Sequence, residues 1–207
     1  MNTATISRAG RSPLHVDKSI HPEIGNQATM LIKNIFLTGP PSVGKTTVIK
    51  KVASGLCRKA TGFYTEELRR GDRRAGFLMK TLDGKEGLLG HEDITSSYHV
   101  RRYGVSLENI EDIAVPAITP RSADAVIIID EIGKMECYSQ AFCEAALKAL
   151  NSSNAVVGTI AVGGTDFIRK IKEREDMKIL EVTLLNRDTL PRVVMDELEA
   201  IFTRGTT

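Results

Sequence analysis

Residues 31–46 read LIKNIFLTGPPSVGKT, and this stretch decides the fold. Its first half, residues 31–38, is a short apolar and β-branched run that ends at Gly39-Pro40-Pro41, which is typical of a buried parallel strand leading into a tight loop. The residues after the loop, 46–58, carry apolar side chains at helical spacing. The sequence therefore predicts a strand, a glycine-rich loop and a helix in direct succession.

The loop itself satisfies the pattern G-x-x-x-x-G-K-[ST]. In a phosphate-binding loop (P-loop) of this kind, successive backbone N–H groups surround an anion at the positive end of a helix. We expect Lys45 to contact the β- and γ-phosphates, the Thr46 hydroxyl to ligate Mg²⁺, and Thr47 to add a phosphate hydrogen bond. The predicted nucleotide-binding residues are Gly39, Pro40, Pro41, Ser42, Val43, Gly44, Lys45, Thr46 and Thr47. A chance match in a turn that only caps a helix is the alternative, and the flanking elements argue against it.

A second informative stretch is AVIII at residues 125–129, which is followed at once by two acids, Asp130 and Glu131. A continuous apolar run predicts a central strand covered on both faces, with its ligand-bearing end at the acids. We predict Asp130 as a second ligand of Mg²⁺, and Glu131 as a catalytic base for water alongside the catalytic Lys45. The alternative is that both acids only solvate the end of the strand.

The rest of the chain alternates between the two kinds of element. Strands are predicted at 62–66, 155–160 and 178–183, helices at 106–118, 139–150, from 166 onward and at 189–202, and a hairpin over 75–90 around Asp83-Gly84. This order predicts an α/β fold with a mainly parallel sheet, helices on both faces and a small β-hairpin insertion. A chain of 207 residues suits a single domain, here 31–203, after a flexible N-terminal extension over 1–30.

Composition limits the partners more than it identifies them. The net charge is +2, so nucleic acid is not a favoured partner, and no apolar run approaches the roughly 20 residues that cross a bilayer. Three cysteines without a C-x-x-C pair indicate a reducing compartment, most simply the cytoplasm, and no zinc site. Residues 1–16 lack acids and carry Arg8 and Arg11, a weak likeness to an organelle transit peptide. The oligomeric state stays open.

Five segments in this order resemble one known family: TGPPSVGKTT (38–47), GFYTEE (62–67), GDRRAGF (71–77), TLDG (81–84) and IDEIGKME (129–136). They are similar to the nucleoside-triphosphatase family named for its thermophile members, which also has a vertebrate, cancer-related member. The likeness runs over 31–202 and implies a RecA-like P-loop fold. It also implies Mg²⁺-dependent hydrolysis of ATP, GTP and other nucleoside triphosphates with broad base tolerance.

The chain departs from that family in two places. Ser42 stands where the family commonly has Gly, and GTIAVGG (158–164) replaces a more basic segment of many prokaryotic members. The second departure places the chain nearer the vertebrate-like branch. Lys134 and Glu136 match the family stretch, but the sequence offers no role for them.

Weaker signals have two interpretations each. A basic loop at residues 69–74 either brings Arg73 or Arg74 to the γ-phosphate as an arginine finger or is a solvated turn. Asn186 and Arg187 follow the last strand and either touch the base or ribose or only begin the next helix. Two other functions use the same loop: a nucleotide or small-molecule kinase, and a slow nucleotide-dependent switch module. Phosphate release from ATP alone and with added acceptors separates the three.

Overall fold

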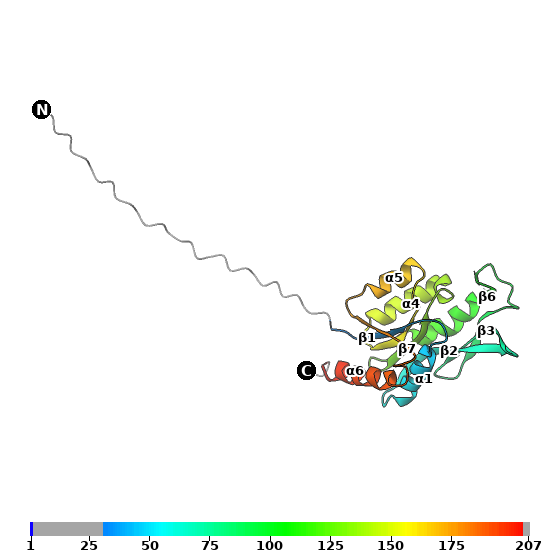
Figure 1. Cartoon of the computed structure of the whole chain (residues 1–207), viewed down its shortest axis with the longest axis horizontal. Coiled ribbons are helices and arrows are strands. Elements are labelled where there is room, and N and C mark those ends of the chain that lie inside the picture. The colour runs from blue at the N-terminus through cyan, green and yellow to red at the C-terminus, as the bar shows by residue number, and fades with distance from the viewer. Residues whose placement is uncertain (2–30, 205–207) are drawn as a thin grey trace.

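The computed structural model describes Met1 and residues 31–204, in which nine strands form one sheet in the order β5-β6-β4-β3-β2-β7-β8-β1-β9 (Figure 1). Apart from Met1, the predicted extension over 1–30 and its transit-peptide-like segment lie outside the described residues. Within the described range, no helix has the length and apolar character needed to cross a bilayer.

Five strands form the parallel half of the sheet. They are β9 (Met177–Glu181), β1 (Asn34–Thr38), β8 (Val156–Ile160), β7 (Val126–Ile132) and β2 (Ala60–Arg70), and each pairs in parallel with its neighbour. The carboxyl ends of these strands meet at one edge of the sheet, where open α/β folds bind ligands. The predicted mainly parallel α/β fold is confirmed.

Alternate side chains of these strands enter two separate cores. Ile35 and Leu37 of β1 pack with α1 (Lys45–Gly55) and α6 (Leu190–Arg204), whereas Phe36 packs on the other face. That second face is covered by α3 (Val115–Ile118), α4 (Gln140–Asn151) and α5 (Asp166–Lys172). Figure 1 shows the two helical layers, with the sheet between them. Because both faces are covered, the strands read as unbroken apolar runs in the sequence.

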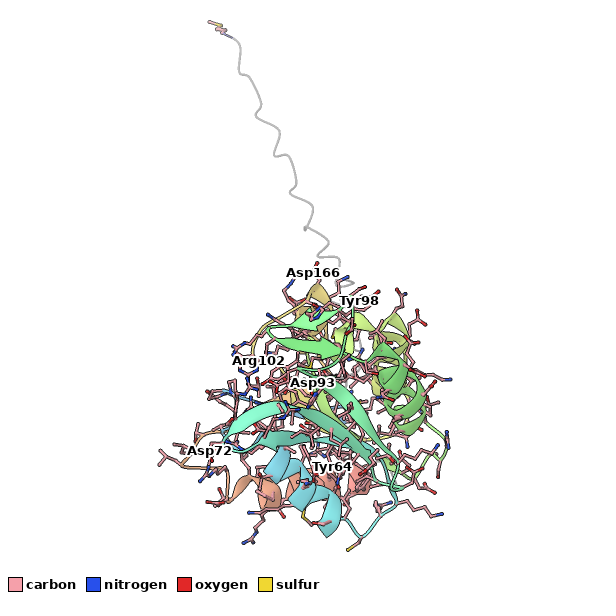
Figure 2. The ribbon with its side chains drawn as sticks, turned by 90° about the vertical axis from the view of Figure 1, so that its right-hand side faces the viewer. Tyr64, Asp72, Asp93, Tyr98, Arg102 and Asp166 are labelled. Atoms are coloured by element: carbon pink, nitrogen blue, oxygen red, sulfur yellow. The ribbon has the colours of Figure 1, made fainter. Side chains whose placement is uncertain are left out.

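The antiparallel half of the sheet extends further than the predicted hairpin. β3 (Arg73–Thr81) and β4 (Glu86–His91) do pair around Asp83-Gly84, and β6 (Tyr103–Val105) and β5 (His99–Val100) continue the same sheet beyond them. β2 is also longer than predicted, because it pairs with β7 over 60–63 and then with β3 over 63–70. The basic run is therefore the tip of a β-hairpin and not a loop, with Asp72 in its turn (Figure 2).

The segment predicted as one helix over 106–118 contains three pieces. Leu107–Asn109 (α2) is followed by a π-helical turn at Ile110–Ala114 and then by α3. Ser106 is the N-cap of α2, since its Oγ accepts a hydrogen bond from the Asn109 N–H at 3.3 Å. Pro116 does not end the helix: the π-helical turn lies directly before α3 and accommodates a residue that has no N–H to donate.

Candidate active site

The P-loop connects β1 to α1 and depends on backbone conformations that few residues adopt. Gly39 and Gly44 have φ angles of 145° and 114°, and a Cβ on Gly39 would lie only 2.8 Å from the Val182 carbonyl oxygen of the chain after β9. Ser42 has a φ of 61°, which is the left-handed region where glycine is the usual residue. The departure from the family's glycine thus occurs at a position whose geometry favours glycine.

Lys45 opens α1, with Gly44 as its N-cap. Its Nζ donates to the carbonyl oxygens of Gly39 and Pro40, at 3.0 and 3.2 Å, so the ammonium lies over the P-loop. Pro40, Pro41, Ser42 and Thr47 are exposed, and Thr46 is half-buried. Val43 is buried in the core between the sheet and α1, which anchors the loop. The first turn of α1 therefore presents a cation and free N–H groups to the strand edge.

Asp130 is buried, and only 1% of it is exposed. Thr159 Oγ1 donates to its Oδ1 at 2.7 Å, and the Thr65 N–H and hydroxyl donate to its Oδ2 at 3.3 and 3.4 Å. The Thr46 hydroxyl also acts on this carboxylate and lowers its pKa. Burial raises the pKa of Asp130, while these hydrogen bonds and the charge of Lys45 act in the opposite direction. Three strands and the start of α1 thus fix this carboxylate.

Glu131 lies beside Asp130 but meets different groups. Burial raises the pKa of Glu131; the charges of Lys45 and Lys172 oppose that rise, and the charge of Asp130 adds to it. Lys172 comes from the end of α5 and donates from Nζ to the Val162 carbonyl oxygen at 2.7 Å. A carboxylate between two lysines, at the edge where the P-loop lies, is placed to act on a bound phosphate and its water.

The sequence predicted that Asp130 and Glu131 come after the end of the strand. In the structure both acids instead lie within β7. β7 runs on to Ile132, whose pairing with Ile160 of β8 resumes after a break in register between Ile129 and Ile132. The apolar run ends at Ile129 because the next two side chains turn to the functional edge, not because the sheet ends there.

Mg²⁺ fits the oxygen groups at this edge. The Thr46 hydroxyl lies close enough to the Asp130 carboxylate to lower its pKa, and both are hard oxygen donors of the kind that Mg²⁺ selects. One carboxylate and one hydroxyl leave most of an octahedral shell to water and substrate phosphates, as is usual for Mg²⁺ in nucleotide enzymes.

Of the two arginine candidates, the structure brings Arg74 to the P-loop. Arg74 forms an ion pair with Glu67 and reaches Ser42, whereas Arg73 pairs with Glu92 at 2.8 Å. Arg102 (labelled in Figure 2) donates from Nη2 to the Arg74 carbonyl oxygen at 2.6 Å and so holds the strand at that position. The sequence could not separate the two, since their side chains diverge only once β2 and β3 are paired.

Asn186 and Arg187, the two residues considered for contact with the nucleotide base or ribose, also differ from each other. The Asn186 side chain accepts from the Thr183 N–H at 2.8 Å and donates to the Glu181 carbonyl at 2.9 Å, so it stabilises the turn after β9. Arg187 instead packs over the P-loop. The Cδ of Arg187 would lie 3.4 Å from a Cβ added to Gly44. A hollow of about 200 Å³ lies there, lined by Gly44, Thr47, Val48, Arg187 and Asp188.

A protein-family model described as NTPase matches residues 34–195 of this chain. The chain belongs to this NTPase family. It is 44% identical over 172 residues to the nucleoside-triphosphatase THEP1 of Thermotoga maritima, covering 83% of this chain and 97% of that protein. It is 38% identical to the human cancer-related nucleoside-triphosphatase, covering 79% and 96% of the two chains. The crystal structure of THEP1 from Aquifex aeolicus superposes with a TM-score of 0.74 at 34% identity, covering 80% and 99%.

Membership in the NTPase family confirms the resemblance drawn from the sequence motifs. The finer placement near the vertebrate-like branch stays a prediction, because identity to the human protein, 38%, falls between the identities to the thermophile proteins of Thermotoga maritima, 44%, and Aquifex aeolicus, 35%. That placement rested on residues 158–164, the buried end of β8 and the turn after it.

Three groups at this NTPase site were not foreseen. Thr65 and Thr159 hold Asp130, and Lys172 faces Glu131. Thr159 had a signal in the sequence: it is the one hydroxyl in the buried strand VVGTI. Thr65 and Lys172 had none, because their neighbours come from strands and helices far away in the chain.

Proposed function

We propose that this protein is a Mg²⁺-dependent nucleoside-triphosphatase that transfers the terminal phosphoryl group of its substrate to water. The observation that carries the proposal is the convergence of Lys45 and Glu131 at the carboxyl edge of β1 and β7, with Thr46 and Asp130 beside them. The names of the nucleoside-triphosphatases in Thermotoga maritima and humans agree with hydrolysis.

Each group at the site has a separate role in the proposed hydrolysis. The P-loop N–H groups and Lys45 hold the β- and γ-phosphates, and Glu131 takes a proton from the attacking water. A bond forms between the water oxygen and the γ-phosphorus, and the bond to the β–γ bridging oxygen breaks. Arg74 and Lys45 stabilise the charge that collects on the departing diphosphate. Mg²⁺, held by Asp130 and Thr46, would neutralise charge on the β- and γ-oxygens.

Broad base tolerance is part of the proposal. The hollow beside Gly44 offers Arg187 as a flat guanidinium that can stack on any base, together with the exposed side chain of Thr47. A site that reads one base by hydrogen bonds rejects the others by several orders of magnitude. We expect kcat/KM for ATP, GTP, CTP and UTP to agree within about tenfold, since stacking discriminates far less than hydrogen-bond readout.

The experiment is phosphate release from those four triphosphates, with Mg²⁺ and with a chelator, and then with nucleosides and nucleoside monophosphates added as acceptors. The proposal expects release that needs Mg²⁺ and that acceptors do not divert. A phosphorylated acceptor would identify a kinase instead, and release that a binding partner must trigger would identify a switch.

A further inference from the structure

Glu136 is a buried acid that the proposed reaction does not use. It begins a 3₁₀ turn at Glu136–Tyr138, four residues beyond the end of β7, and only 4% of it is exposed. The backbone amides of Gly133 and of Glu136 itself act to lower the pKa of its carboxyl group, against the larger effect of burial. Burying a charged carboxylate without a cation is costly, so the group calls for an explanation.

The surroundings of Glu136 are acidic. Burial, together with the charges of Glu131 and Asp130 on β7, raises the pKa of Glu136 to about 8. Cys137, the next residue in the same turn, is the other titratable group that it affects. Two lysines, Lys45 of the P-loop and Lys172 of α5, act on Glu131 and not on Glu136. At neutral pH the group is thus mainly a neutral acid with one O–H to donate.

The Glu136 and Glu131 carboxyl groups both lie close to Gly133. A Cβ added to Gly133 would lie 2.8 Å from Glu136 Oε2 and 3.4 Å from Glu131 Oε1. The charge of Glu131 also raises the pKa of Glu136 more than the charge of Asp130 does. A residue without a side chain at 133 is what lets the two carboxyl groups approach each other.

We propose that Glu136 is a positioning residue for Glu131: as a neutral acid it donates a hydrogen bond to the Glu131 carboxylate and holds it in the orientation that activates water. The inference rests on the proposed function, because it assigns Glu136 through Glu131. It explains why an acid is buried here without a cation: Glu131 is the acceptor for its proton. Lys45 and Lys172 supply the positive charge that keeps Glu131 ionised beside it.

Two substitutions separate this role from simple packing. Glu136→Gln keeps the volume and a donor but cannot ionise, whereas Glu136→Leu keeps the approximate volume and removes the donor. We expect kcat to fall by about 10- to 100-fold in Glu136→Leu, since small misplacement of a catalytic group costs up to that much. Glu136→Gln should retain kcat within about threefold, because an amide N–H replaces the acid O–H. The affinity for a non-hydrolysable triphosphate should be unchanged in both.

The pH profile gives a readout that does not depend on the leucine variant folding. In the wild type, kcat should fall as pH rises through about 8, because Glu136 then loses its proton and repels Glu131. Glu136→Gln should lack this decline. Asp176→Asn is the matched control: Asp176 is an acid of which 4% is exposed at the opposite edge, paired with Arg174, so its loss lowers stability but leaves kcat unchanged.

The results distinguish this inference from the function on which it rests. If the wild type hydrolyses ATP and Glu131→Gln does not, but folded Glu136→Leu turns over normally, the positioning role is wrong and the function stands. A glutamine variant that loses activity as severely as the leucine variant, or that keeps the decline near pH 8, also contradicts the role. If the wild type releases no phosphate, the proposed function itself is wrong.

Discussion

Arg73 and Arg74 are neighbours in β3, yet their guanidinium groups contact different parts of the protein. Arg74 Nη2 donates to Ser42 Oγ of the P-loop at 3.1 Å, while Arg73 Nη2 lies 2.8 Å from Glu92 Oε1. The Arg74 Nε is buried and has no hydrogen-bond partner within the described part of the chain. Of these two arginines, Arg74 therefore reaches the P-loop while it is paired with Glu67, and Arg73 points to an ion pair with Glu92.

This divergence predicts different kinetics for two adjacent substitutions. Arg74→Ala should lower kcat by ~10³-fold, the smaller of the effects seen when an arginine finger is lost, and should weaken triphosphate binding much less. Arg73→Ala is the matched control and should change kcat by less than about threefold, since exposed ion pairs contribute little. Steady-state phosphate release and equilibrium nucleotide binding measure both. Equal turnover in the two variants would show that Arg74 has no role in the reaction.

Lys45→Ala should damage binding as well as turnover. The substitution removes the ammonium that lies over the P-loop, and a hydrogen bond to a charged group contributes about 1.5–3 kcal/mol, which corresponds to roughly 10- to 100-fold in Kd. Lys50→Ala, on the same helix but paired with Glu66, is the control and should bind normally. Titration with a fluorescent triphosphate gives both affinities. Wild-type hydrolysis by Lys45→Ala would mean that the loop is not the phosphate site.

Substitutions around Asp130 should change the Mg²⁺ requirement. Asp130→Asn removes a charged metal ligand, and Thr159→Val removes the 2.7 Å hydrogen bond that orients it. Loss of such an outer partner typically costs 10- to 100-fold in metal affinity, so we expect the half-saturating Mg²⁺ concentration to rise at least about tenfold in each variant. Phosphate release across a Mg²⁺ titration is the measurement. An unchanged midpoint in Asp130→Asn would assign the metal to other residues.

Gly62 predicts an effect on folding, not on chemistry. Its φ is 115°, and an added Cβ would lie 1.9 Å from the Ile128 carbonyl oxygen across the β2–β7 pair. Gly62→Ala should lower the free energy of unfolding by more than about 3 kcal/mol, because backbone would have to move. Gly71→Ala, with a φ of 61° but nothing within 4 Å, should cost about 1 kcal/mol. Urea unfolding compares the two, and equal losses would contradict the close approach.

The sequence was sufficient for the features that depend on local pattern. The P-loop is contiguous, so its residues and its place between β1 and α1 could be predicted from one stretch, and the apolar run of β7 marked a central strand. Features that depend on register could not. Arg73 and Arg74 look equivalent until β2 pairs with β3, and the antiparallel strands beyond β4 are too short to show alternation.

The same limit applies to the site. Asp130 could be predicted from its position after an apolar run, but Thr65 and Thr159, which hold it, come from strands 65 and 29 residues away in the chain. Asn186, which follows a strand at the functional edge, had two interpretations in the sequence, and in the structure its side chain closes the turn after β9. Glu136 showed no role until folding brought it beside Gly133 and Glu131.

The central claim is that Glu131 activates water against a triphosphate held by the P-loop. Its most direct test is the release of phosphate from ATP in ¹⁸O-labelled water by the wild type and by Glu131→Gln, with triphosphate binding measured alongside. The account predicts one water oxygen in each phosphate released by the wild type. In Glu131→Gln it predicts a rate lower by roughly 10²- to 10⁴-fold, the usual contribution of a positioned base, with binding intact. Phosphate without the label, or near-normal turnover in the variant, would contradict the account.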